Sequence, residues 1–345
     1  MFPTPDEIRA ARAENPKHRA RDLADKLGIS EAQLVASDVG RGATRIAAHP
    51  DGLMAAAASL GEVMALTRNE SCVSEKVGRY ANYTPGQHAA MVLNGAIDLR
   101  IFPRHWVNAF AVETEGEAGP RRSLQVFDAA GDAMHKIHLR ETSNHGAWSG
   151  LVTSLAVADQ SDTLAVEPRP EPEGARSDPE RLEVLRKEWL RMTDTHQFLR
   201  LTSKLKMNRL GAYRIVGEPW VRPLSTASVP EMLNRVSAEG CEAMIFVGNR
   251  GCIQIHSGRL DRIVPMGPWQ NVMDPGFNLH LRGDHVAEVW QVEKPTQRGP
   301  ALSVEAFAAN GDLIFQAFPV AKPENDHRPA WREIVEALPG LEVPA

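Results

Sequence analysis

An internal repeat constrains the fold of this chain more than any other feature of its sequence. A shift of 180 residues aligns RSLQVFDAAGD, which starts at residue 122, with LSVEAFAANGD, which starts at residue 302. The same shift aligns IDLR (97–100) with FNLH (277–280) and Phe110 with Trp290, while shifts of 178 and 183 align 18–30 with 196–208 and Trp148 with Trp331. Four blocks in one order at nearly one offset predict that the 345 residues are two similar halves.

The hydrophobic pattern predicts the same order of elements in each half. Residues 5–36 are expected to form helices, with Gly28 ending one and Ser30 capping the next. Residues 52–67 start as a helix and give way to a strand. Alternating apolar residues separated by turn signals then predict antiparallel strands in 71–140, before a helix around Trp148. Helices return at 179–217, strands follow at 242–320, and a helix around Trp331 ends the series. The predicted fold is α+β, an internal duplication in which each half is a large antiparallel sheet with helices at its start and end.

A proline-rich stretch separates the two halves. Residues 160–179 hold four prolines and many charges, a composition typical of a linker. We therefore expect an N-terminal repeat at 1–160, a linker at 161–180 and a C-terminal repeat at 181–345.

Composition excludes several classes of protein. Lys and Arg number 39 against 44 Asp and Glu, so the net charge of −5 argues against a protein that coats nucleic acid or anionic membrane. The cysteines, Cys72, Cys241 and Cys252, fit neither a disulfide framework nor a structural zinc site, and the absence of a CxxCH motif excludes covalently attached haem. With no secretory signal and no apolar run long enough to span a bilayer, a cytoplasmic protein is expected.

Two local motifs have structural explanations that we prefer. ARDLADKLGISEAQLV is similar to a helix-turn-helix, but its second helix, SEAQLVAS, carries no basic residue with which to contact DNA. Its second copy, KLKMNRLGAYRI, is more basic and is expected to lack the same turn. GNRG (248–251) predicts a type I′-like hairpin turn, and no phosphate-binding loop, because no Lys-Ser/Thr or helix follows it.

Two further residues allow both a structural and a functional interpretation. Trp189, Met192, His196 and Leu199 recur at helical spacing, which places His196 on an apolar face near the start of a new helix capped by Thr193 or Asp194. Such a histidine is usually a core residue, and the alternative is an axial ligand of a haem iron. Arg100 alternates with Ile97, Leu99 and Ile101 on a strand, so it faces away from the core with Asp98 and Phe102. Its counterpart in the repeat is His280.

Several long motifs together resemble the bacterial hemin-degrading factor family, of the HemS/ChuS/HmuS type. They are IDLRIFPRHW (97–106), TDTHQF (193–198), EAMIFVGNRGCIQIHSG (242–258), GPWQNVMDPGFNLHL (267–281), EVWQVEKPTQRG (288–299) and SVEAFAANGDLI (303–314). The match covers nearly the whole chain and includes the duplication. Members of this family are cytoplasmic haem binders of haem-iron uptake, and some are reported to open the macrocycle and release iron.

The resemblance implies a role for each matching residue. His196 corresponds to the proximal iron ligand and Arg100 to a distal arginine from the first half, with haem held on the second half beside the interface. Phe102, Met244 and Phe246 would line the pocket, and Arg209 and Lys294 would lie near the propionates. Phe and Met suit an apolar disc, and Arg and Lys suit carboxylates. Where the family usually has a Tyr and then an Arg, this chain has Phe318 and Ala321 in FQAFPVAKPEN, and Lys322 lies next to the second position.

The resemblance therefore implies a cytoplasmic protein that binds haem b, accepts it from an importer, and either degrades it with release of iron or passes it on. As an enzyme it would need an external electron donor, because the sequence holds no flavin or nicotinamide motif. As a carrier or storage protein it would pass haem to a downstream haem oxygenase. Arg100 is the candidate catalytic residue. One tight haem per chain is expected, in a monomer or a weak homodimer. A DNA-binding regulator that uses the N-terminal helices is a third, disfavoured interpretation.

Overall fold

The computed structural model of the chain describes residues 3–117 and 119–341. By its contacts the chain divides into two compact units. Unit 1 consists of Met1–Arg68, Ser74–Pro170 and Gly248–Gln254, and unit 2 consists of Asn69–Val73, Glu171–Val247 and Ile255–Ala345.

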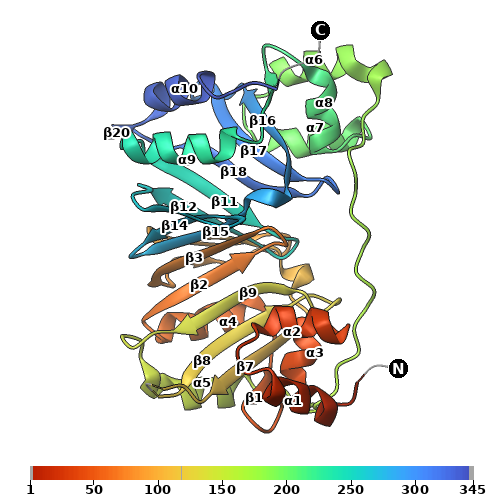
Figure 1. Cartoon of the computed structure of the whole chain (residues 1–345), viewed down its shortest axis with the longest axis vertical. Helices are drawn as coiled ribbons and strands as arrows, with labels where there is room; N and C mark the ends of the chain where they lie inside the picture. The colour runs from red at the N-terminus through yellow and green to blue at the C-terminus, as the bar shows by residue number, and fades with distance from the viewer. Residues whose placement is uncertain (1–2, 118, 342–345) are drawn as a thin grey trace. The chain divides into compact units, whose positions relative to one another are not determined.

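Unit 1 begins with three short helices, α1 (Pro5–Glu14), α2 (Ala20–Leu27) and α3 (Glu31–Ala36) (Figure 1). Gly28 ends α2 in the left-handed conformation, at φ 66°. Ser30 caps α3 through a capping box with Gln33. These are the helices and the caps that the sequence predicts.

The strands of unit 1 form an antiparallel series with α3 on one face and two further helices on the other. Their order is β1 (Ala43–Ile46), β7 (Asn108–Thr114), β8 (Arg121–Phe127), β9 (Ala133–Leu139), β2 (Glu62–Arg68) and β3 (Cys72–Arg79). A second ladder runs through β4 (Tyr83–Thr84), β5 (Ala90–Asn94) and β6 (Ile97–Ile101), with β6 paired to Cys252–Gln254. Helices α4 (Pro50–Ser59) and α5 (Trp148–Leu155) pack against the sheet through Met54, Leu53 and Trp148.

Unit 2 repeats this order element by element. Its helices α6 (Leu182–Leu190), α7 (Gln197–Lys204) and α8 (Arg209–Val216) correspond to α1–α3. Its sheet order is β10 (Val221–Leu224), β16 (Val286–Lys294), β17 (Ala301–Ala308), β18 (Leu313–Pro319), β11 (Ala243–Gly248) and β12 (Cys252–Gly258). The second ladder is β13 (Ile263–Met266), β14 (Trp269–Asp274) and β15 (Phe277–Arg282), and a small pair, β19 (Ala321–Lys322) and β20 (Asn325–Asp326), follows β18.

The helices that cover the sheet of unit 2 are α9 (Ser228–Ala238) and α10 (Arg328–Glu336). Helix α10 is the predicted one around Trp331, whereas α9 and strands β1 and β10 lie where the pattern made no prediction. Pro230 interrupts the helical pattern of α9, but it lies in the first turn, where no intrahelical N–H bond is required. The matching order of elements in the two units confirms the predicted α+β duplication.

The turn between α7 and α8 corrects one expectation. The second copy of the helix-turn-helix segment has the same turn as the first, because Lys206 takes the left-handed conformation of Gly28, at φ 59°. Asn208 caps α8 as Ser30 caps α3, by accepting from the N–H of Gly211 at 2.9 Å. A non-glycine residue in this conformation costs free energy, and for that reason the sequence pattern does not reveal the turn.

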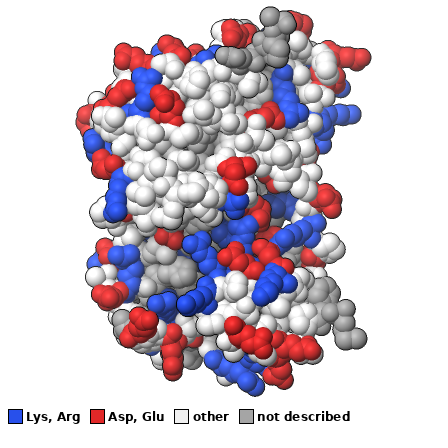
Figure 2. Space-filling view, viewed as in Figure 1, with Lys and Arg blue, Asp and Glu red and all other residues white. Residues whose placement is uncertain are grey.

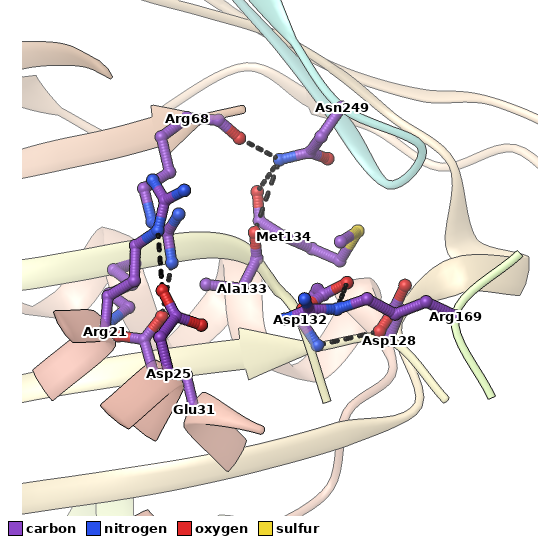
Figure 3. Close-up of polar contacts among 11 residues, drawn as sticks. Arg21, Asp25, Glu31, Arg68, Asp128, Asp132, Ala133, Met134, Arg169 and Asn249 are labelled. Carbon is purple, nitrogen blue, oxygen red and sulfur yellow. Dashed lines mark hydrogen bonds and ion pairs between the residues drawn. The ribbon is translucent and has the colours of Figure 1, made fainter. Parts of the chain in front are cut away.

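The hairpin at 249–251 also differs from the expectation. A type I′ turn needs positive φ at both central residues, and Asn82 and Lys206 are the residues other than glycine with positive φ in the described chain. Instead, Oδ1 of Asn249 accepts from the N–H groups of Gly251 and Cys252, both at 2.9 Å. Its Nδ2 donates to the carbonyls of Arg68 at 2.8 Å and Met134 at 2.9 Å, within unit 1 (Figure 3).

The same device recurs 180 residues earlier. Asn69 accepts from Ser71 and Cys72, and its amide donates to the carbonyl of Ile314, within unit 2. Asn69 and Asn249, like Met134 and Ile314, are 180 residues apart. Each unit therefore holds one hairpin tip through an asparagine at the equivalent position of the repeat.

The predicted linker has no helix or strand from residue 161 to residue 178. Its first part is bound to unit 1, where Arg45 donates to the carbonyl of Ser161 at 2.8 Å and Gln33 to that of Leu164 at 3.1 Å. Its last part is bound to unit 2, where Asn208 donates to the carbonyl of Gly174 at 2.7 Å.

Candidate functional site

One face of the sheet in unit 2 carries the apolar residues that the sequence singled out. Along β11, Ala243, Ile245 and Val247 are buried in the core that includes α9, so Met244 and Phe246 point to the opposite face and are half-buried. Phe318 of β18 is the cross-strand partner of Met244, and its ring lies 5.3 Å from that of Phe246. The structure thus brings Met244, Phe246 and Phe318 together as a partly exposed platform, which we call the apolar platform.

A row of cross-strand neighbours runs from this platform across the same face. Phe246 pairs with Gln316, Gln316 with Glu305, and Glu305 with Trp290. Because residues paired across antiparallel strands share a face, the carboxylate of Glu305 lies on the face of the platform.

Glu305 is the centre of a buried charged cluster. Its side chain is fully buried and accepts from Lys294 at 3.0 Å, Arg209 at 2.9 Å, the Tyr213 hydroxyl at 3.0 Å and Ser303 at 2.9 Å. Burial alone would raise the pKa of Glu305, but the charges of Lys294 and Arg209 outweigh it and hold the pKa at about 2. One carboxylate faces two cations, so the cluster carries one positive charge in excess.

The two predicted propionate partners differ in their access to solvent. The side chain of Lys294 is 4% exposed, donates to Tyr213 at 2.7 Å and lies 4.8 Å from the ring centre of Phe198. The side chain of Arg209, on α8, is 20% exposed. Of the two, Arg209 is the one that a ligand could reach without disruption of the cluster.

His196 is the residue just before α7 and is exposed to solvent. The predicted cap by Thr193 or Asp194 is wrong, because His196 itself is the N-cap and no side chain caps the helix. Its side chain is 91% exposed. Asp194 accepts from the backbone N–H of His196 at 2.7 Å and contacts its Nδ1 at 2.6 Å. These two contacts lower the pKa of Asp194. No described residue bonds to Nε2 of His196. The exposure of the ring to solvent excludes the core-histidine interpretation.

The helix that carries His196 is anchored to the charged cluster. Phe198, two residues further, is 1% exposed and its ring stacks on Tyr213 with centroids 5.4 Å apart. The expected apolar helix face is only partly present. Helix α6 ends at Leu190 and α7 begins at Gln197, so no single helix carries the whole face, and Leu199 is 56% exposed. Contacts within unit 2 therefore link His196 through Phe198 and Tyr213 to Glu305 and the row that ends at Phe246.

Arg100 and Phe102 belong to unit 1. Ile97, Leu99 and Ile101 of β6 are buried, so the predicted alternation is confirmed, and Arg100 lies on the other face, paired with Asp98. The backbone N–H of Phe102, just after β6, donates to the carbonyl of Gly251 at 3.0 Å. In unit 2 the corresponding strand is β15, where Nδ1 of His280 lies 2.8 Å from Oδ1 of Asn271.

The face of unit 1 that corresponds to the platform has diverged. The equivalent row is Leu66, Lys136, Gln125 and Phe110, and Met64 pairs with His138 where unit 2 pairs Met244 with Phe318. Lys136 and Arg68 both bind the buried carboxylate of Glu31 (Figure 3 shows Arg68 beside Glu31). The buried carboxylate of unit 1 therefore comes from a helix, as Glu31 of α3, whereas that of unit 2 comes from the sheet, as Glu305 of β17.

Sequence reasoning missed Glu305 and Tyr213, and it considered Asp194 only as a helix cap. The signal for Glu305 was an acidic residue at an inward-facing position of the apolar strand LSVEAFA, where a buried charge requires counter-ions. Ala321 and Lys322, at the position where the family's arginine is absent, are exposed on β19.

The charged surface and the helices give two further observations. In Figure 2, Lys and Arg side chains of unit 1 lie intermixed with Asp and Glu side chains. No helix within 3–117 or 119–341 combines the length and the apolar character needed to cross a bilayer.

Comparison with known proteins identifies the family. The family model of the haemin-degrading HemS.ChuX domain matches residues 28–155 and again residues 206–338. The hemin transport protein HmuS of Yersinia pestis is 38% identical over 336 residues, which are 97% of this chain and 97% of that protein.

Solved structures with the same architecture agree with this match. The crystal structure of holo-PhuS, a heme-binding protein from Pseudomonas aeruginosa, is 39% identical, with a TM-score of 0.93 over 98% of this chain and 100% of that one. ChuS, an E. coli heme oxygenase, is 33% identical, with a TM-score of 0.85 over 95% of this chain and 98% of that one. With two matches to one family model and similarity along nearly its entire length, the chain belongs to the haemin-degrading HemS.ChuX domain family.

Proposed function

We propose that this protein binds haem on unit 2, with His196 as the axial ligand of the iron, and serves haem-iron assimilation in the cytoplasm. It would accept imported haem and either degrade it with release of iron or pass it on. The relatives support this proposal, because they include a hemin transport protein, a heme-binding protein and a heme oxygenase.

The residues of unit 2 fit the ligand in three respects. The apolar platform offers an aromatic and thioether surface to the macrocycle. The excess positive charge of the Glu305 cluster favours carboxylates, and Arg209 is the partly exposed cation from which a propionate could accept hydrogen bonds. Buried Lys294 stabilises this arrangement, because it donates hydrogen bonds to Glu305 and Tyr213.

The observation that carries the proposal is the orientation of the His196 ring, which is exposed to solvent and bonded to Asp194 through Nδ1. A histidine that binds a metal through one ring nitrogen usually donates the N–H of the other to a carboxylate or a carbonyl. His196 has this arrangement before any ligand is present, with Nδ1 on Asp194 and the rest of the ring in solvent.

The motif of Arg100 resembles that of the family's distal arginine. Bound haem would supply an iron centre that binds oxygen or water. A guanidinium there can donate hydrogen bonds and stabilise developing negative charge. We propose that Arg100 and Phe102 take these positions, on the strength of the resemblance of IDLRIF to the family motif. Electrons for any degradation would come from an external donor.

Replacement of His196 tests the proposal. Haem titration of His196→Ala is expected to show a shifted Soret maximum and a loss of affinity. His18→Ala is the matched control, because His18 aligns with His196 in the repeat and is also exposed, and it should behave as wild type. A His196→Ala protein with the wild-type spectrum and affinity would refute the assignment.

Exposure of the haem complex to oxygen separates an enzyme from a carrier. The complex is formed anaerobically, and oxygen is admitted with a reductant and with catalase, which removes free peroxide. Loss of the Soret band with release of iron and a tetrapyrrole product would identify an enzyme. A persistent Soret band would identify a carrier.

A further inference from the structure

We propose that Asp194 is a positioning residue for His196, which holds the ring in the tautomer that directs the lone pair of Nε2 toward the ligand. This inference rests on the proposed function, because it concerns the residue that would ligate the iron. It adds a carboxylate–histidine pair to the site and makes the axial ligand a stronger electron donor than a solvated imidazole.

The geometry gives Asp194 two donors from the same residue. Its Oδ1 lies 2.7 Å from the backbone nitrogen of His196 and 2.6 Å from the ring Nδ1. A carboxylate can only accept, so Nδ1 must carry the proton. In the neutral ring the other nitrogen, Nε2, then carries the lone pair.

The segment around this pair is held in place by further bonds. Gln197 closes a ring with Thr193, because its Oε1 accepts from the Thr193 backbone at 2.9 Å and its Nε2 donates to Thr193 Oγ1 at 3.1 Å. The carbonyl of Thr193 accepts from the N–H of Gln297 at 3.0 Å. Phe198 is buried immediately afterwards, at 1% exposure. These bonds account for Thr193, Gln197 and Phe198 in the TDTHQF motif, and they leave the Asp194–His196 pair as the part directed to solvent.

A carboxylate partner has consequences for a metal bound to the other nitrogen. It raises the basicity of the ligand and fixes the plane of the ring, and loss of such a partner typically lowers metal affinity by about 10–100-fold. A stronger donor also stabilises ferric over ferrous iron. We therefore expect Asp194→Ala to weaken haem binding by about 10–100-fold and to raise the reduction potential of the bound haem.

A purely structural role for Asp194 makes different predictions. The carboxylate also accepts from the backbone N–H of His196, just before α7 begins, and a bond that only closes this turn would influence stability without any effect on the tautomer or on the iron–histidine bond. Asp178 offers a matched control in the same unit, because its side chain also accepts from the backbone N–H two residues later, at 3.2 Å, while its ion pair is with Arg181 rather than with a histidine.

The first experiment needs no haem. The protein is labelled with ¹⁵N-histidine and examined by NMR at alkaline pH. The His196 signals are assigned by comparison with the spectrum of the His196→Ala variant. We expect wild type and Asp178→Ala to hold His196 with its proton on Nδ1, and Asp194→Ala to show a mixture of the two tautomers. Unchanged tautomer populations in Asp194→Ala would overturn the inference.

The second experiment measures the iron–histidine bond of the ferrous haem complex by resonance Raman spectroscopy. The stretching frequency is expected to fall in Asp194→Ala and to remain unchanged in Asp178→Ala. If His196→Ala loses the band while Asp194→Ala keeps the wild-type frequency, the positioning role is wrong and the proposed function stands. If His196→Ala keeps the band, the proposed ligand itself is wrong.

Discussion

Glu305→Gln offers the sharpest test of the charged cluster that joins the sheet of unit 2 to its helices. The substitution keeps the size of the side chain and removes its charge, so Lys294 and Arg209 remain next to each other without a counter-ion. The Glu305 side chain is fully buried and the Lys294 side chain is 4% exposed, so solvent cannot replace the lost carboxylate.

Two independent estimates give the size of the effect. The fall of the Glu305 pKa from 4.5 to about 2 corresponds to roughly 3 kcal/mol in favour of the charged form. Removal of one partner from a buried ion pair typically costs about 3–5 kcal/mol. We therefore expect Glu305→Gln to lower the free energy of unfolding of unit 2 by about 3–4 kcal/mol at pH 7.

Guanidinium chloride denaturation followed by tryptophan fluorescence is a suitable assay, because Trp189 is fully buried beside this cluster, with Lys294 Nζ 6.0 Å from its ring centre. Glu288→Gln is the matched control. Its carboxylate is 25% exposed and pairs with Arg214, which is 47% exposed, so solvent screens the pair and the loss should stay below about 1 kcal/mol.

A double substitution tests the cause. Lys294→Met added to Glu305→Gln removes the unpaired ammonium and should restore part of the lost stability, because a buried ion pair replaced as a whole costs much less than one that is broken. A single mutant within about 1 kcal/mol of wild type, or a double mutant no more stable than the single, would refute the electrostatic account.

Three further predictions can be checked by equally direct measurements. Arg100→Ala should change the spectrum of the bound haem while most of the affinity remains, because one distal hydrogen bond contributes about 1–3 kcal/mol; an unchanged spectrum in a haem titration would contradict its distal role. Burial, with a smaller effect from His138, lowers the pKa of His135 to about 3, so the unfolded chain takes up a proton that the folded chain does not, and stability is lost as the pH falls from about 6.5 toward 3. Denaturation at several pH values should show that His135→Gln reduces this slope by up to ~1.4 kcal/mol per pH unit, and an equal slope in both proteins would exclude His135 as its source. Asn249→Ala removes two accepted hydrogen bonds and those that the amide donates to three carbonyls, and it should lower unfolding stability by about 2–3 kcal/mol, with a similar loss for Asn69→Ala in unit 2; a loss below about 0.5 kcal/mol would show that the hairpin tips do not depend on these asparagines.

The elements of this fold were predictable where the residues that define them are neighbours in sequence. The alternation around Arg100, the Ser30 cap and the Gly28 helix end depend on residues a few positions apart, and all three were predicted. The duplication was predictable for a different reason, because an internal repeat compares the chain with itself and needs no knowledge of contacts.

Elements with weak local signals were missed. Strand β1 has only four residues, α9 contains a proline, and the α7–α8 turn uses Lys206 in a conformation that glycine normally takes. In each case packing within the unit stabilises a conformation that local preference alone does not favour.

The candidate site also has a part that local sequence predicted and a part that only the tertiary structure revealed. Sequence patterns alone placed His196 near the start of a helix, and the family motifs selected Met244, Phe246, Arg209 and Lys294. Only the tertiary structure revealed that Lys294 and Arg209 share the carboxylate of Glu305, and that Asp194 holds His196. A buried charge is set by the partners that surround it, and those partners come from positions as far apart as 209 and 305, so no local pattern contains the information.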